Sequence, residues 1–104
     1  MVVVTFPFSD LSASKQRPAL VLASVSRGDL ILCQITSRAV TGPLAVSLNP
    51  GDFASGSLPR QSNIRPERLF TAHESIVRAT VGIVAESKLD QVIDAVIRVL
   101  RPPN

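Results

Sequence analysis

Apolar residues recur along most of the chain in short runs that are separated by turn-forming residues, a pattern typical of short β-strands. Valine and isoleucine are frequent in these runs, and β-branched side chains favour extended backbone. In the run LAVSL, Leu44, Val46 and Leu48 alternate with other residues and so share one face of a strand. The pattern predicts strands over residues 2–6, 19–24, 30–35, 44–48, 62–70 and 79–84.

The segments between these runs are rich in turn formers. Residues 7–18 read PFSDLSASKQRP and predict a loop that is longer than most connections. Gly28 predicts a hairpin turn between the second and third strands. Residues 49–59 predict another loop, and Gly82 marks a bulge or a close packing contact.

The period of the pattern changes near the C-terminus. From Leu89 to Leu100, apolar residues recur at i, i+3, i+4 and i+7, which predicts an amphipathic helix. Ser87 and Asp90 resemble a capping box with aspartate in place of glutamate, and the prolines after Arg101 end the helix.

Many short strands followed by one helix predict a mostly β fold. We expect a small, strongly curved antiparallel sheet or barrel with a C-terminal helix, forming one domain over residues 1–104. A sheet of this size has exposed edge strands, and we expect it to associate as a homodimer.

Composition narrows the possible functions. The chain of 104 residues is 45% hydrophobic and 18% charged, which is typical of an ordered globular protein. No apolar run reaches the ~20 residues that cross a bilayer, and the N-terminus lacks the features of a signal peptide. Cys33 is the only cysteine, so an intramolecular disulfide and a multi-cysteine zinc site are excluded, and a reducing cytoplasm is expected. No phosphate-binding glycine loop or carboxylate cluster points to a cofactor or a two-metal site.

The charge balance is basic, with a net charge of +3 and a pI of about 10.0. Arginine supplies most of the cations, and its planar fork suits phosphate groups. The balance therefore permits binding to nucleic acid, and an acidic protein partner would fit the same surface.

Two neighbouring segments carry the first candidate site. Lys15 and Arg17 precede Pro18, which biases Arg17 toward extended backbone at the start of the second strand. Thr36, with Ser37 and Arg38 after it, ends the third strand, where a hydroxyl can donate to a phosphate oxygen beside arginine. Antiparallel pairing through the intervening turn brings Arg17 close to Thr36. The alternative is an ordinary solvated loop and hydroxyls bonded only to local backbone.

A second group of candidates lies in SNIRPER and just after it. Arg65 and Arg68 extend a cationic surface, and Ser62 is a candidate for a backbone hydrogen bond. His73 is the one side chain that ordinarily titrates near neutral pH, but a lone histidine is more often structural than catalytic. Cys33 lies among apolar residues of a strand and is expected in the core.

Three segments resemble a known family. VTFPFSDLSASKQRPALVL resembles the opening signature of the MazF/PemK toxins of bacterial toxin–antitoxin systems, ILCQITS resembles their next strand, and SNIRPERLFTAHESIVRATVGIV resembles their later glycine-hydrophobic region. The resemblance implies an SH3-like antiparallel barrel of the CcdB/MazF type with a C-terminal α-helix, acting as a cytoplasmic homodimer. It also implies a cognate antitoxin, usually acidic and partly disordered, as the partner.

The resemblance further implies an activity: metal-independent cleavage of single-stranded RNA, commonly mRNA, at short motifs, with no cofactor. Arg17 and Thr36 fall on the family's catalytic positions, and Lys15, Ser37, Arg38, Ser62 and Arg65 become candidates for substrate binding. One alternative is an inactive homologue that only binds RNA or antitoxin, and a more distant one is a gyrase-poisoning toxin of the same fold. The presence of both Arg17 and Thr36 favours the enzyme.

Overall fold

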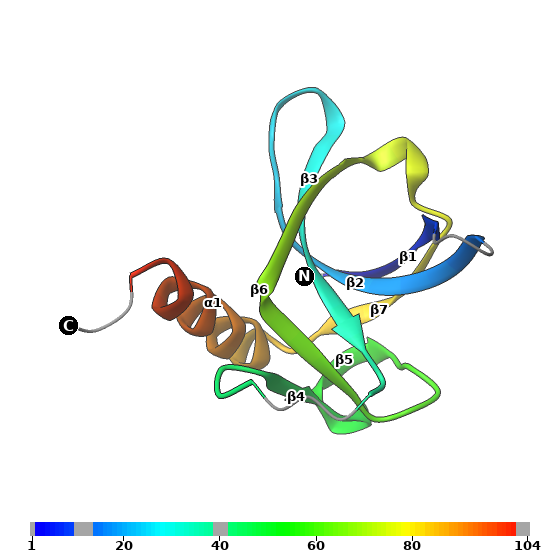
Figure 1. Cartoon of the computed structure of the whole chain (residues 1–104). Helices are drawn as coiled ribbons and strands as arrows, with labels where there is room; N and C mark the ends of the chain where they lie inside the picture. Colours follow the sequence, from blue (N-terminus) through cyan, green and yellow to red (C-terminus); the bar gives the residue numbers. More distant parts are fainter. Residues whose placement is uncertain (1, 10–13, 39–41, 102–104) are drawn as a thin grey trace.

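Seven strands form one antiparallel sheet that curls into a half-barrel, with a single helix against its lower part (Figure 1). The computed structural model describes residues 2–9, 14–38 and 42–101. The strand order across the sheet is β4-β6-β3-β2-β1-β7-β5. The strands and the helix are β1 (Val2–Ser9), β2 (Ser14–Ser24), β3 (Asp29–Thr36), β4 (Val46–Leu48), β5 (Phe53–Gly56), β6 (Ser62–His73), β7 (Ala79–Val84) and α1 (Glu86–Leu100). The predicted mostly β fold with a C-terminal helix is confirmed.

The loop predicted over residues 7–18 is wrong at both of its ends. β1 continues to Ser9 and β2 begins at Ser14, and the two remain paired as far as Ser9 opposite Ser14. The hydrogen bonds between paired strands come from main-chain groups, so polar side chains do not prevent pairing. The polar ends of β1 and β2 are therefore missed when strands are predicted from apolar runs alone. Arg17 therefore lies within a strand and opposite Phe6, rather than in a loop before it.

Two other expectations are corrected. The predicted loop over residues 49–59 contains β5, a short strand that pairs with β7. The helix begins at Glu86 with Ala85 as its N-cap, and no side chain caps it, so the capping box at Ser87 is wrong. The Asp52 carbonyl instead accepts a hydrogen bond of 2.7 Å from the Ala85 backbone N–H, and Lys88 lies 3.5 Å from the Asp52 carboxylate.

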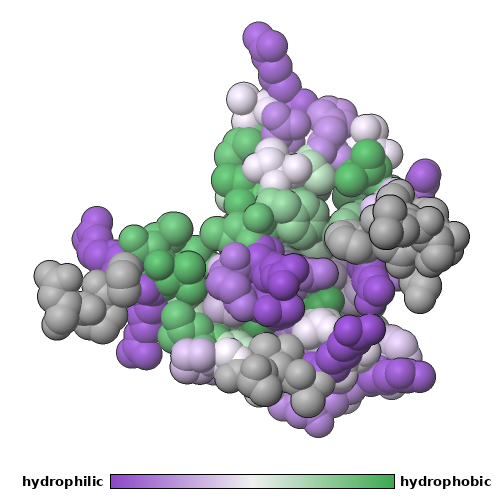
Figure 2. All heavy atoms as spheres, in the orientation of Figure 1, coloured by the Kyte–Doolittle hydropathy of each residue, from purple (hydrophilic) through white to green (hydrophobic). Residues whose placement is uncertain are grey.

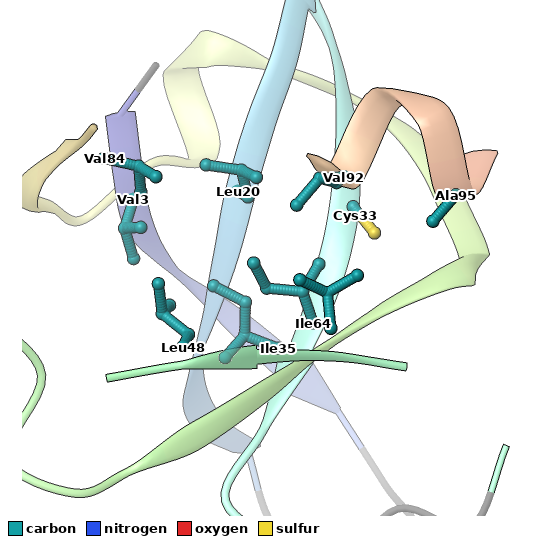
Figure 3. Packing of buried hydrophobic residues seen from close by; sticks show 10 residues of the cluster. Val3, Leu20, Cys33, Ile35, Leu48, Ile64, Val84, Val92 and Ala95 are labelled. Carbon is teal, nitrogen blue, oxygen red and sulfur yellow. The ribbon is translucent and has the colours of Figure 1, made fainter. Parts of the chain in front are cut away.

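One hydrophobic core lies between the sheet and α1, and we call it the helix-side core. Side chains from six strands converge there on two residues of α1 (Figure 3). Leu20 and Ile64 are fully buried at its centre, and burial of such a side chain stabilises a fold by roughly 2 kcal/mol. Its buried residues are Val3, Leu20, Cys33, Ile35, Val46, Leu48, Ile64, Val84, Val92 and Ala95.

The opposite face of the same strands forms a second cluster, the hairpin-side core. It consists of Val4, Phe6, Ala19, Val21, Leu30 and Leu32, with Phe70 and Ala72 of β6 packed against them. Because successive residues of a strand point to opposite faces, β1, β2 and β3 supply alternate residues to the two cores. This division places Arg17, Gln34 and Thr36 on the hairpin side of the sheet, in continuation of Ala19 and Leu32.

Cys33 is fully buried in the helix-side core, as expected, and its thiol donates a hydrogen bond of 2.8 Å to the Arg65 carbonyl. Burial raises the pKa of this thiol from its usual 9.0 to about 12, and the negative charge of Glu67 acts in the same direction. The folded chain therefore keeps a proton that the unfolded chain loses above pH 9.

We expect the free energy of unfolding to fall as pH rises from 9 to 12, by about 1.4 kcal/mol per pH unit at most, because the unfolded state binds fewer protons there. Urea unfolding at pH 8, 9.5 and 10.5 measures this slope against a Cys33→Ala variant, which lacks the thiol. The chain has no tyrosine, so few other groups titrate in this range. Equal slopes in the two proteins would contradict the assignment.

Within the described ranges, no helix is long and apolar enough to cross a membrane.

Candidate functional site

Arg17 and Thr36 lie on neighbouring strands, Arg17 within β2 and Thr36 at the end of β3. The pairing of β2 with β3 runs through Leu20 opposite Cys33 and Ala19 opposite Gln34, and the same register continued by two residues sets Arg17 opposite Thr36. Residues directly opposite each other in a sheet share a face and have Cβ atoms ~5 Å apart. The short turn at Gly28 joins the two strands, and a bulge between Val21 and Ala23 shifts their register by one residue, so that Arg17 rather than Pro18 is set opposite Thr36.

Both residues line one open pocket of about 340 Å³. Gln16 and Ser37 flank them on the same strand ends, and Arg60 approaches from the loop before β6. The remaining lining is mostly apolar and comes from Thr5, Pro18, Ile35, Leu58, Pro59 and Ser62. Two guanidinium groups and a hydroxyl around a partly apolar hollow form an arrangement suited to an anionic ligand that carries a flat ring.

The Thr36 hydroxyl is held in place by the turn that follows β3. Its Oγ1 accepts a hydrogen bond of 3.2 Å from the Arg38 backbone N–H, and the Arg38 carbonyl accepts one of 3.2 Å from the Asn63 amide of β6. The first bond occupies an acceptor lone pair of the hydroxyl, whose O–H remains the donor that a phosphate oxygen requires. Asn63 is a supporting residue that was not a candidate from the sequence.

Ser62 contacts the pocket but uses its hydroxyl internally. The side chain is 4% exposed, and its Oγ donates a hydrogen bond of 3.1 Å to the Arg60 carbonyl. Ser62 thereby fixes the backbone of Arg60, the second cation of the pocket. Arg60 was not a candidate from the sequence, because its approach to Arg17 depends on how the loop before β6 packs.

Of the other predicted substrate-binding residues, Arg38 and Arg65 do not line this pocket. Arg38 is exposed just beyond β3. Arg65 lies on β6 opposite Gln34, and its guanidinium is 3.1 Å from the Glu67 carboxylate. The backbone of Lys15 pairs with Phe8, but the Lys15 side chain is outside the described part of the structure. The structure thus brings together Arg17, Thr36, Ser37 and Ser62.

His73 has a structural environment, in agreement with the more frequent role of a lone histidine. Its Nδ1 accepts a hydrogen bond of 3.1 Å from the Ser75 backbone N–H, so the ring proton sits on Nε2. Nε2 then donates to the Arg27 carbonyl over 3.0 Å. The ring joins the end of β6 to the turn between β2 and β3, away from the pocket of Arg17.

Comparison with known proteins agrees with the fold and the sequence pattern. Residues 1–100 match the family model of PemK-like, MazF-like toxins of type II toxin–antitoxin systems. No curated protein matches the chain. The *Mycobacterium tuberculosis* toxin MazF-mt6 is similar in structure, with a TM-score of 0.77 and 13% identity over 96% of each chain.

Two further solved structures contain complexes. A mycobacterial endoribonuclease with its cognate antitoxin has a TM-score of 0.75 at 19% identity, covering 99% of this chain and 94% of that one. A MazE–MazF structure from *Deinococcus radiodurans* has a TM-score of 0.72 at 22% identity, covering 95% and 91%. At such identities the structures establish the fold, and the family follows from the model that spans nearly the whole chain. The chain belongs to the PemK-like, MazF-like toxin family of type II toxin–antitoxin systems.

Proposed function

We propose that the protein is the toxin of a toxin–antitoxin pair and a metal-independent endoribonuclease that cuts single-stranded RNA, chiefly mRNA in the cytoplasm, at short sequence motifs. The observation that carries the proposal is the pocket that Arg17 and Thr36 share. Similar structures that are named endoribonucleases support the same activity.

The reaction proposed is a transesterification within the RNA itself. The 2′-oxygen loses its proton and attacks the adjacent phosphorus, and the bond from phosphorus to the 5′-oxygen breaks. The leaving 5′-oxygen takes up a proton, so the products are a 2′,3′-cyclic phosphate and a 5′-hydroxyl. Negative charge gathers on the non-bridging oxygens and the leaving oxygen in the transition state, and fixed donors aimed at that charge are usually the largest catalytic contribution.

Arg17 supplies such donors at the pocket. A guanidinium stays charged at any physiological pH and presents N–H groups in a planar fork that matches phosphate oxygens. We assign Arg17 to stabilise the transition state and Thr36 to orient the phosphate through its hydroxyl. The described residues of the pocket include no histidine and no carboxylate, and we assign no general base.

Arg60 is the second cation in this scheme, and we assign it to a neighbouring phosphate. Arg60→Gln is expected to weaken binding to a 2′-O-methyl oligonucleotide and to make the slope of log affinity against log salt shallower by about 0.7, the value for one contact in a single strand. Fluorescence anisotropy measures both quantities, with Arg98→Gln on α1 as the control. Adding Ser62→Ala to the Arg60→Gln protein should change the binding affinity little further. An unchanged salt slope in Arg60→Gln would show that Arg60 does not contact a phosphate.

The direct test is cleavage of a long single-stranded RNA by the purified protein in EDTA, with the cut ends mapped chemically. Discrete cuts that leave cyclic phosphates and 5′-hydroxyls are expected. Intact RNA in the presence of a folded protein would reject the enzyme and leave a binding module.

Two partners complete the proposal. An acidic antitoxin fits the net charge of +3, and two of the similar structures are complexes with antitoxins. A second copy of the chain fits the exposed apolar residues of α1, which are Ile93, Ile97 and Leu100. Apolar surface is visible in the region of this helix, at the left of Figure 2. Light scattering at micromolar concentration should give the mass of a dimer, and a monomeric mass would count against it.

A further inference from the structure

A second pocket lies on the hairpin side of the sheet and takes no part in the scheme above. It is open, has a volume of about 340 Å³ and is lined by Phe6, Gln34, Arg68, Leu69 and Phe70. The Phe6 and Phe70 rings lie 4.9 Å apart with a tilt of 43°. We call it the aromatic pocket. Apolar surface is visible over this upper part of the sheet in Figure 2.

The polar groups of the aromatic pocket are Gln34 and Arg68. Within the part of the chain that the structure describes, no residue hydrogen-bonds to the Gln34 amide or to the Arg68 guanidinium. Arg68 lies in a bulge of β6. Cys33 of β3 pairs with Leu69, and the next residue, Gln34, pairs with Arg65. Residues 66–68 therefore have no partner in β3. Bulges of this kind re-aim side chains next to functional sites.

Two residues of the aromatic pocket are neighbours in the sheet of the candidate catalytic residues Arg17 and Thr36. Phe6 lies directly opposite Arg17 in the pairing of β1 with β2, so the two side chains share a face. Gln34 precedes Thr36 by two residues on the same face of β3, a separation of roughly 7 Å along the strand. A phosphate held by Arg17 and Thr36 would therefore have the base of an adjoining nucleotide within reach of the aromatic pocket.

We propose that the aromatic pocket binds a purine base next to the scissile phosphate and so sets part of the cleavage-site preference, an inference that rests on the proposed ribonuclease function. In single-stranded RNA the bases are free to stack on aromatic or guanidinium planes and to be read along their edges. A glutamine side chain can make two hydrogen bonds to one adenine, and an arginine side chain can make two to one guanine. Both contacts are made along an edge of the purine base. Phenylalanine supplies the stacking surface, which tolerates either purine.

The chain has no tryptophan, so a Phe70→Trp variant carries a single fluorescent reporter inside the aromatic pocket. The probes are 2′-O-methyl hexamers of adenosine and of uridine, which carry equal charge and cannot be cut by their own 2′-oxygen. We expect the adenosine hexamer to quench the emission at least two-fold and to bind about ten-fold more tightly than the uridine hexamer. Phe53→Trp, on β5 against the helix-side core, is the matched control and should show no quenching.

A second measurement covers the case in which Phe70→Trp does not fold. Cut sites in a long RNA are compared for wild type, Arg68→Gln and the control Arg101→Gln at the end of α1. Arg68→Gln should reduce the preference for a purine beside the cut about ten-fold, and Arg101→Gln should leave it unchanged.

The outcomes separate this inference from the function on which it rests. An unquenched Phe70→Trp protein that still binds the hexamers by anisotropy, or an unchanged cut-site preference in Arg68→Gln, overturns the purine site and leaves the ribonuclease intact. If the wild-type protein neither cleaves RNA nor binds the hexamers, the proposed function is rejected, and the purine site is rejected with it.

Discussion

Arg17→Ala is expected to lower the rate of RNA cleavage about 100- to 1,000-fold, the usual effect of removing one donor to transition-state charge. Arg17 lies opposite Phe6 and, by register, Thr36. Arg60, the other arginine that lines the pocket, comes from the loop before β6 and is assigned to a neighbouring phosphate. Initial rates on a short RNA that contains one mapped cut site measure the effect.

Two variants make this measurement specific. Arg17→Lys keeps the charge but loses the planar fork, so it should recover only part of the rate. Arg101→Ala removes an exposed cation at the end of α1 and should stay within two-fold of wild type. A rate for Arg17→Ala within a few-fold of wild type, in a protein with an unchanged melting temperature, would show that the transition state is stabilised elsewhere.

Gly82→Val is expected to destabilise the fold by about 3 kcal/mol or more, the largest effect on stability that we foresee. A Cβ at Gly82 would lie 2.5 Å from the Ser55 carbonyl oxygen and 2.9 Å from the Phe53 ring. The carbonyl belongs to β5, which pairs with β7 at this point, so relief requires the two strands to separate. The melting temperature should fall by more than ten degrees, at about 4–8 °C per kcal/mol for a chain of this size.

Gly51→Ala is the matched control for this substitution. No atom lies within 4 Å of the position that its Cβ would occupy, so the free energy of unfolding should change by no more than about 0.5 kcal/mol. Thermal unfolding followed by circular dichroism compares the three proteins. A stable Gly82→Val protein would mean that β5 and β7 are not in contact.

The sequence predicted correctly those strands that carry a recognisable pattern of apolar and β-branched side chains. β7 has the predicted bounds because residues 79–84 are apolar and β-branched between turn formers. β5 was missed because its backbone pairs at Gly56 and Gly82, where the two strands approach too closely for side chains. Gly56 also has a φ of 71°, a conformation that favours glycine. No periodic pattern of apolar residues can record such a contact.

The same distinction applies to the candidate site. Arg17 and Thr36 could be placed near each other from the sequence because one short turn joins their strands, but their register also depends on a bulge between Val21 and Ala23 that the sequence did not predict. Arg60 and Asn63 reach the site from β6 and the loop before it, and their positions depend on the packing of segments far apart in the chain. Long-range contacts of this kind leave no signal in one sequence.

The place of β1 in the sheet has a consequence for the order of events during synthesis. β1 lies between β2 and β7, so one edge of β1 stays unpaired during synthesis until β7, the last of the seven described strands, has emerged. Closure of so long a loop costs more entropy than the formation of the hairpin of β2 and β3. We expect a growing chain to form that hairpin early but to complete its sheet only after β7 is made, so a chain interrupted before β7 would expose an unpaired strand edge that is prone to aggregation.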